Sequence, residues 1–447
     1  MPDWKRKIQE YEAEYLEDLR KLVQIASVRN LKTAEIGAPF GKEIREAFDG
    51  FLAIAQKCGF EMEDSEGYAC HVQLGEAEEY VGVLGHLDVV EAGEIEKWQT
   101  APFVMEKKGD MLYGRGVNDD KGPLLAALYA ARIIKDMQRP LKRSIRIIAG
   151  GAEETTWECM EHYFSKHKQP VMGFSPDGNF PIVNGEKGIA KFQLIFPEKK
   201  KNLQGEYEVE KVDCKKLENY VCGDLSIRVR QKGERKLFTW KGKKQALSRN
   251  PQRGDNVLWD FAEDFCGKSF VQPEFEQLTA FIKECLSDDF YGEKSGLYAK
   301  DENMGTTSVC PTGLCRNGQG ICMYLDIRYP RSTDEETLYR RLKELGQIYG
   351  FETVLYSRKR LLYVPEDSEL ILALKQAYEK VTGEEAFTFT KGGASYARTL
   401  DCGVAFGATF EGEETNPHMP NECMSLMSVE RAMEIYCEAL WRLAVEC

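Results

Sequence analysis

The first residues of the chain alternate apolar and polar side chains with the period of an α-helix. Apolar residues recur at steps of three and four, at Ile8, Tyr11, Tyr15, Leu19 and Leu22. This spacing places them on one face of a helix, with charged residues on the opposite face. The pattern predicts an amphipathic helix that packs onto the body of the protein.

Two short apolar runs further along the chain predict buried strands, and polar residues follow each of them directly. Residues 80–84 lead into Gly85-His86, and residues 144–149 lead into a loop that contains Glu153 and Glu154. Between the runs, Pro123 begins a segment of helical spacing, where proline is favoured in the first turn. Strand, loop, helix and strand predict an α/β fold whose functional side chains gather at the carboxyl ends of strands.

The pattern changes after Gly188 and returns near residue 364. Residues 189–363 contain strand-like pieces with charged interruptions, and helical spacing resumes with Leu370, Leu374 and Tyr378. We therefore expect a discontinuous domain, residues 1–188 and 364–447, with a central mixed sheet flanked by helices. An inserted α+β domain, residues 189–363, would interrupt it.

Composition narrows the class of protein. The 447 residues are 43% hydrophobic and 30% charged, with a net charge of -13. No apolar run reaches the roughly 18 residues of a membrane span, and the first residues lack the apolar segment of a secretory signal. We expect a soluble cytoplasmic protein whose 14 cysteines are free thiols. The negative charge disfavours nucleic acid and membrane surfaces as partners.

Five motifs combine acidic residues or histidine with glycine or proline. They are Gly85–Asp88, Gly114–Pro123, Glu153–Glu154, Ser175–Gly178 and Asn416–Glu422. Together they supply two imidazoles and several carboxylates, a ligand set that Zn²⁺ accepts, with a further glutamate available as a base. The set predicts a two-metal hydrolase. The remaining histidines, His71, His162 and His167, are expected to be structural or solvated.

The order of these motifs and the residues within them resemble those of the M20 metallopeptidases, and within that family those of the bacterial dipeptidases of the PepV type. The resemblance also includes Trp98–Phe103, Phe174–Gly188, Leu325–Pro330 and Lys391–Arg398, so it covers nearly the whole chain. It implies a catalytic domain with an inserted lid. The long insert is similar to the lid of a monomeric enzyme, with a homodimer as the alternative.

The resemblance also implies the metal ligands. One divalent ion would be held by His86, Asp119 and Asp177, and a second by Asp119, Glu154 and His418, with Asp119 bridging. The two ions are expected to be Zn²⁺, with Mn²⁺ or Co²⁺ as alternatives.

Two further acidic residues would act without binding a metal. Glu153 would be the general base, and Asp88 would accept the second ring N–H of His86 and so fix its tautomer. The resemblance further implies a cis peptide bond between Asp119 and Asp120.

Substrate contacts are implied for the predicted lid and for a glycine-rich segment after it. Arg328 matches an arginine that binds the substrate carboxylate, a role suited to a planar bidentate donor. Gly392, Gly393 and Ser395 would offer backbone N–H groups to the same end of the substrate. Asn219 would lie near the other end.

One departure from the family pattern concerns catalysis. Leu247 stands where the family carries a lid histidine that polarises the scissile carbonyl, and the predicted lid contains no histidine. Loss of one such donor lowers the rate roughly 10²- to 10³-fold. Either Gln245, Arg249 or a lysine among residues 241–244 replaces it, or the enzyme is slow or altered in substrate.

These observations favour a metal-dependent dipeptidase that hydrolyses unblocked dipeptides with metal-activated water and a glutamate base. Two alternatives stay open. The first is an amidase or deacylase of N-acyl amino acids that uses the same metals. The second is a catalytically impaired binding protein that keeps its metals but lacks the lid histidine.

Overall fold

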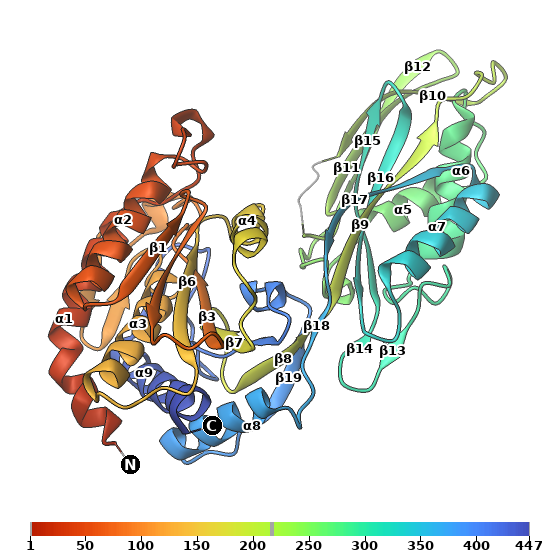
Figure 1. The fold of residues 1–447 in the computed structure, drawn as a ribbon. Helices are drawn as coiled ribbons and strands as arrows, with labels where there is room; N and C mark the ends of the chain where they lie inside the picture. The colour runs from red at the N-terminus through yellow and green to blue at the C-terminus, as the bar shows by residue number, and fades with distance from the viewer. Residues whose placement is uncertain (1, 215–218, 447) are drawn as a thin grey trace. The chain divides into compact units, whose positions relative to one another are not determined.

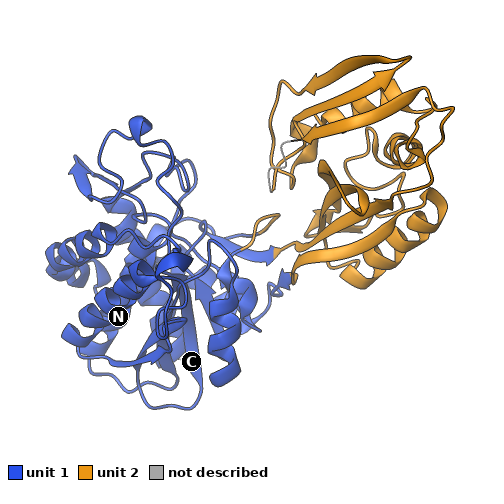
Figure 2. Ribbon diagram, turned by 90° about the horizontal axis from the view of Figure 1, so that it is seen from above, with its two compact units in different colours: residues 1–185, 362–389, 395–447 blue, residues 186–361, 390–394 orange. Residues whose placement is uncertain are grey.

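The computed structural model describes residues 2–214 and 219–446. The chain forms two compact units (Figure 2). Unit 1 comprises residues 1–185, 362–389 and 395–447, and unit 2 comprises residues 186–361 and 390–394. The sequence analysis placed the insert at residues 189–363.

Residues 390–394 belong to unit 2, so the chain enters this unit a second time. The predicted insert, residues 189–363, does not include this segment. Backbone N–H of Lys187 donates to the Lys391 carbonyl at 3.0 Å, and the Thr390 hydroxyl donates to the Asn303 carbonyl at 3.0 Å. These hydrogen bonds fix the short segment against residues of the insert, although it is distant from them in sequence.

A nine-stranded mixed sheet forms the centre of unit 1 (Figure 1). Its order is β1 (Glu61–Ser65), β2 (Ala69–Leu74), β6 (Ser144–Gly150), β3 (Tyr80–His86), β7 (Met172–Ser175), β20 (Gly403–Ala405), β8 (Ile182–Glu186) and β18 (Leu362–Tyr363), with β19 (Thr388–Lys391) paired to β8. Strands β6, β3, β7 and β20 are parallel neighbours. Antiparallel pairs join β1 to β2, β2 to β6, and β8 to β20. The predicted α/β class with a mixed sheet is confirmed.

Helices pack against this sheet and against one another. They are α1 (Trp4–Gln24), α2 (Lys42–Lys57), α3 (Lys121–Asp136), α4 (Glu158–Lys166), α8 (Glu369–Thr382) and α9 (Leu426–Trp441). The predicted face of α1 is buried at Ile8, Tyr15, Leu19 and Leu22. Helix α3 is buried along most of its surface, because α1, α9, β3 and β6 all pack against it.

A small antiparallel sheet brings two distant parts of unit 1 together. Strand β5 (Met111–Tyr113) pairs with β4 (Glu106–Lys108) on one edge and with β21 (Cys423–Ser425) on the other. The loop that precedes α3 therefore lies beside the loop that contains residues 416–422.

Unit 2 is an α+β unit with its own apolar core. A four-stranded antiparallel sheet has the order β15 (Ser308–Asn317), β16 (Gly320–Tyr329), β9 (Gly188–Pro197) and β17 (Glu352–Lys359). A second sheet contains β10 (Tyr207–Cys214), β11 (Asp224–Gln231) and β12 (Glu234–Lys241), and β13 (Lys300–Asp301) pairs with β14 (Gly305–Thr306). The main helices are α5 (Val257–Phe265), α6 (Pro273–Phe281) and α7 (Glu335–Tyr349). Within the described residues, no helix has the length and apolar character needed to cross a bilayer.

Candidate active site

The predicted metal ligands meet at one edge of the large sheet. His86 ends β3, Asp177 follows β7, and Glu154 follows β6, so the ends of three parallel strands supply them. Asp119 lies two residues before α3, and His418 lies in the loop before β21. The structure therefore brings side chains from five segments of unit 1 to one place.

Asp119 lies between the two imidazoles. Its Oδ1 is 3.0 Å from Nε2 of His86, and its Oδ2 is 2.9 Å from Nε2 of His418. His418 also contacts Glu154 Oε1 at 3.0 Å, and Asp177 Oδ2 lies 3.9 Å from His86 Nε2. One carboxylate thus offers a separate oxygen to each side of the site, as a bridging ligand requires.

The charges at this place favour a bound cation. Hydrogen bonds that the His418 ring donates to Asp119 and Glu154 raise the pKa of His418 to about 11. Burial opposes charge on His86, yet its contacts with Asp119 and Asp88 raise its pKa well above the usual value. Burial raises the pKa of Asp177 to about 7, and nearby Asp119 adds to this shift. The carboxylates therefore attract positive charge that a divalent ion could supply in place of protons.

The donor set itself fits a divalent transition metal. His86, Asp119 and Glu154 each offer one donor atom, and these atoms lie within 4.8 Å of one another. Nε2 of His86 is buried and faces the carboxylates of Asp119 and Asp177 at 3.0 and 3.9 Å. A buried ring nitrogen beside carboxylates matches the mixed nitrogen and oxygen ligands of zinc sites.

Asp88 acts differently from the expectation. The nearest partner of His86 Nδ1 is the backbone carbonyl of Asp88 at 2.9 Å, whereas the Asp88 carboxylate is 3.6 Å away. That carboxylate accepts backbone N–H groups of Glu153 at 3.2 Å and Glu154 at 3.1 Å. Asp88 therefore orients His86 through its main chain and holds the backbone of both glutamates with its side chain.

Glu422 is a site residue to which sequence reasoning gave no role. Its fully buried carboxylate accepts backbone N–H groups of Gly116, Asn118 and Asp119 at 3.0–3.1 Å, and Arg115 Nη1 at 2.6 Å. It thereby fixes the loop that presents Asp119. Glu422 lies within the Asn416–Glu422 motif, and its position two residues after a loop proline and next to a strand was the available signal.

Asp120 is a second such residue. Its buried carboxylate accepts the backbone N–H of His86 at 3.1 Å, and burial raises its pKa well above the usual value. The peptide bond between Asp119 and Asp120 is cis, as predicted. Asp120 therefore ties the end of β3 to the start of α3.

The predicted substrate residues of unit 2 also lie together. Arg328 donates to both oxygens of Asp326 at 2.8 and 2.9 Å, to the Gly392 carbonyl at 3.2 Å and to Asn219 Oδ1 at 3.4 Å. Gly393 follows Gly392 in the same segment. The guanidinium is held rigidly by these contacts. Ser395, in contrast, belongs to unit 1.

The segment aligned with the missing histidine adjoins this group. Leu247 pairs with Tyr220, and the Ser248 hydroxyl donates to Asp326 Oδ2 at 2.7 Å. The Arg249 side chain packs against the backbone of Gly392 and Gly393. Burial and the charge of Arg328 lower the pKa of Arg249. Among the candidate replacements for the histidine, Arg249 is thus the one placed beside Arg328.

Comparisons with known proteins agree with these findings. Residues 82–442 match the model of peptidase family M20/M25/M40. Two relatives, each named "Putative dipeptidase", come from Staphylococcus haemolyticus, at 33% identity, and Bacillus subtilis, at 30% identity; each alignment covers 99% of this chain and 100% of the relative. The fold is similar to a solved dipeptidase from Saccharomyces cerevisiae (TM-score 0.62, 16% identity, 98% and 97% coverage) and to human carnosine dipeptidase 1 (TM-score 0.60, 15% identity, 98% coverage of both).

Proposed function

Because the chain belongs to the M20/M25/M40 family of peptidases, we propose that it is a two-metal dipeptidase acting on unblocked dipeptides. The observation that carries the proposal is the position of Asp119, with one carboxylate oxygen against each imidazole. We further propose that the protein is a monomer and that it acts on small peptides in the cytoplasm.

Five residues would hold the metals. His86, Asp119 and Asp177 would bind one ion, and Asp119, Glu154 and His418 the other, with Zn²⁺ as the expected metal. When bound, such ions polarise a carbonyl oxygen and lower the pKa of a water molecule. The separate oxygens of Asp119 support the bridging role assigned to it.

Glu153 would move the proton. Glu154 is committed to His418 at 3.0 Å, so we assign proton transfer to the neighbouring glutamate. In this mechanism Glu153 takes a proton from the attacking water and gives it to the leaving amine. Asp88 fixes the backbone N–H groups of both glutamates, which holds the base at a constant distance from the ligands.

Arg328 would bind the carboxylate of the dipeptide. Its guanidinium is already oriented by Asp326, so little rotamer freedom is lost when an anion binds. Gly392, Gly393 and Ser395 would contribute to the same end of the substrate, and Asn219 to the other end.

A substrate panel tests the proposal. The protein, loaded with Zn²⁺ or Mn²⁺, is assayed with unblocked dipeptides, tripeptides and N-acetyl amino acids. Hydrolysis of dipeptides alone is expected. Preferential hydrolysis of N-acetyl amino acids would instead identify a deacylase, and tight binding of dipeptides without turnover would identify an impaired binding protein.

A further inference from the structure

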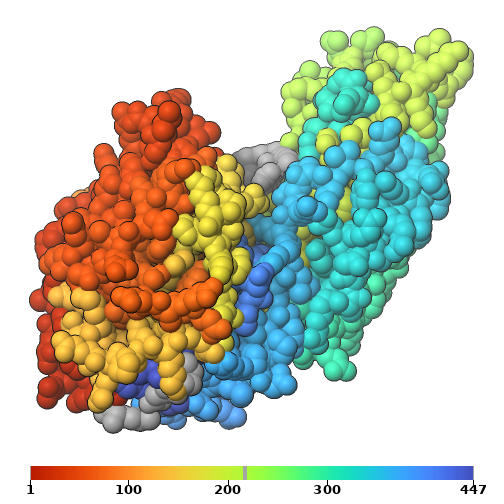
Figure 3. Space-filling model, in the orientation of Figure 1, coloured from red at the N-terminus to blue at the C-terminus, as the bar shows by residue number. Residues whose placement is uncertain are grey.

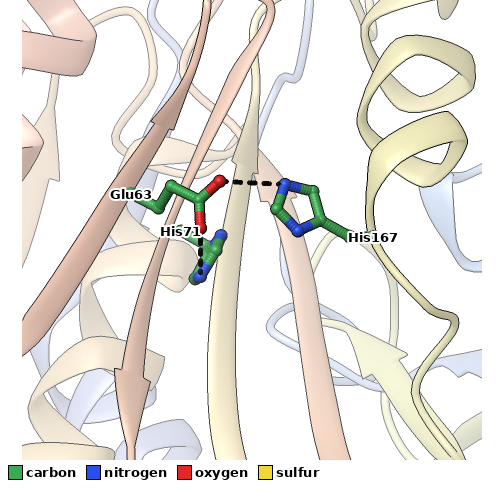
Figure 4. A group of neighbouring side chains, drawn as sticks. All are labelled: Glu63, His71 and His167. Atoms are coloured by element: carbon green, nitrogen blue, oxygen red, sulfur yellow. Dashed lines mark ion pairs between the residues drawn. The ribbon is translucent and has the colours of Figure 1, made fainter.

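Three side chains outside the candidate active site converge at the edge of the large sheet in unit 1. Glu63 lies on the edge strand β1, His71 lies opposite it on β2, and His167 ends α4. Oε2 of Glu63 is 4.0 Å from Nε2 of His71, and Oε1 is 3.3 Å from Nε2 of His167. Figure 4 shows the carboxylate facing both imidazole rings.

We propose that Glu63, His71 and His167 form a second site for a divalent transition-metal ion, such as Zn²⁺. Their donor atoms lie within 4.8 Å of one another. Two imidazoles and one carboxylate are a common zinc ligand set, and a water molecule can take the fourth position. Glu63 is exposed, so the site opens to solvent on that side.

Tyr163 orients both imidazoles. Its ring stacks on His167 with centroids 4.3 Å apart, and its hydroxyl lies 3.1 Å from Nδ1 of His71. A metal-bound histidine commonly donates its other ring N–H to an oxygen, and the hydroxyl can accept it. Nε2 of His167 is buried and faces Glu63 Oε1 at 3.3 Å, without the geometry of a hydrogen bond. The group therefore has an oriented ligand and a buried nitrogen that a cation would satisfy.

The surroundings of the rings also bear on a metal. His71 is buried and His167 is half-buried, whereas Glu63 is exposed. Arg146 opposes a cation here, although Gln73 binds its guanidinium at 2.6 Å and the ring of Tyr80 lies 4.2 Å from it. We therefore expect this site to bind Zn²⁺ with lower affinity than a site of the same ligands without a nearby positive charge.

A metal at this place would join two elements at the surface of unit 1. It would link the edge strand β1 to the end of α4, the helix that follows the loop of Glu153 and Glu154. Figure 3 shows yellow residues, the part of the chain that contains α4, at the surface beside orange residues that precede them in the sequence. Because its ligands would come from different elements, the ion would act as a structural link between them.

Elemental analysis after equilibrium dialysis against buffered Zn²⁺ tests the proposal. The wild-type protein is compared with Glu63→Gln and His167→Asn. The matched control is His162→Asn, because His162 lies on the same helix but stacks on Tyr68 and contacts Glu66. We expect Glu63→Gln and His167→Asn to hold one Zn²⁺ fewer per chain, with affinity at this site reduced at least tenfold, and His162→Asn to match the wild type.

Equal zinc content in the wild type and in Glu63→Gln and His167→Asn would overturn the proposal. The test compares the zinc content of variants with that of the wild type. Ions bound at the candidate active site contribute equally to each protein, so the difference does not depend on the proposed function. If His167→Asn fails to fold by circular dichroism, the exposed Glu63→Gln variant decides.

Discussion

The side chain of Asp88 determines how the two neighbouring glutamates are presented. It accepts the backbone N–H groups of both Glu153 and Glu154, while its own carbonyl orients His86. One residue thus sets the relative positions of a proposed ligand, a proposed base and an imidazole. Replacement of either glutamate should leave this backbone arrangement in place, which makes the two side chains separable by mutation.

We expect Glu153→Gln to lower kcat by about 10²- to 10⁴-fold, because the amide cannot accept the proton of the attacking water. Metal content should stay at the wild-type value. Steady-state kinetics and elemental analysis measure the two effects. The comparison variant Glu154→Gln should lose metal, since Glu154 contacts His418. A Glu153→Gln enzyme with near wild-type kcat would refute the assignment of the base.

We expect Arg249→Ala to lower kcat by about 10²-fold with a smaller effect on KM, because a donor to the developing oxyanion acts mainly in the transition state. Gln245→Ala is the control. Introduction of Leu247→His into the Arg249→Ala variant should raise kcat again. Unchanged kcat in Arg249→Ala would show that another group polarises the carbonyl.

The sequence predicted candidate ligands from their motifs, but it did not predict contacts between distant loops. His86, Asp119, Glu154 and His418 were recognisable because each stands in a motif of distinctive neighbours. The contact of the Asp88 carboxylate with two distant amides was not, because it depends on how the loops after β3 and β6 lie together.

At the level of elements, Glu422 connects the β21 segment to the loop before α3. Its carboxylate is buried with Arg115 and three backbone N–H groups, so both of its oxygens have hydrogen-bond donors within the protein. The pairing of β21 with β5 holds the two segments in register. The position of Asp119 therefore depends on residues near the C-terminal end of unit 1.

We expect Glu422→Gln to lower the free energy of unfolding by about 3–5 kcal/mol, because it leaves the buried Arg115 without a counter-charge. Urea denaturation measures the change. Glu414→Gln, at an exposed position of the same loop, should alter stability by less than about 0.5 kcal/mol. Equal midpoints for Glu422→Gln and the wild type would contradict this account.

Local patterns predicted elements better than they predicted contacts between elements. The spacing of Ile8, Tyr15, Leu19 and Leu22 was sufficient to predict the buried face of α1. The group of Glu63, His71 and His167 was missed, because it requires the pairing of β1 with β2 and the packing of α4 beside them. The return of residues 390–394 to unit 2 depends similarly on hydrogen bonds between distant segments.

For the whole molecule, metal removal should affect the two units unequally. The proposed ligands all belong to unit 1, whereas unit 2 has a separate apolar core. A ligand present at 100 times its Kd stabilises the folded state by about 2.7 kcal/mol. We expect a chelator to lower the melting temperature of unit 1 and to leave that of unit 2 unchanged.

Differential scanning calorimetry with and without chelator measures the two transitions. The His86→Ala variant serves as the reference, because it should lack most of the metal-dependent shift. Equal shifts of both transitions would contradict the assignment of the ligands to one unit.

The discontinuity of unit 1 also determines the order in which its parts leave the ribosome. Residues 1–185, which carry His86, Asp119, Glu153, Glu154 and Asp177, are synthesised before unit 2, and His418 is synthesised after it. Strand β20, which lies between β7 and β8 in the large sheet, also comes from the later segment. A nascent chain therefore has nearly all of unit 2 available while the sheet of unit 1 still lacks β20 and the site lacks one imidazole. The proposed metal centre can therefore be completed only after residue 418 has been synthesised.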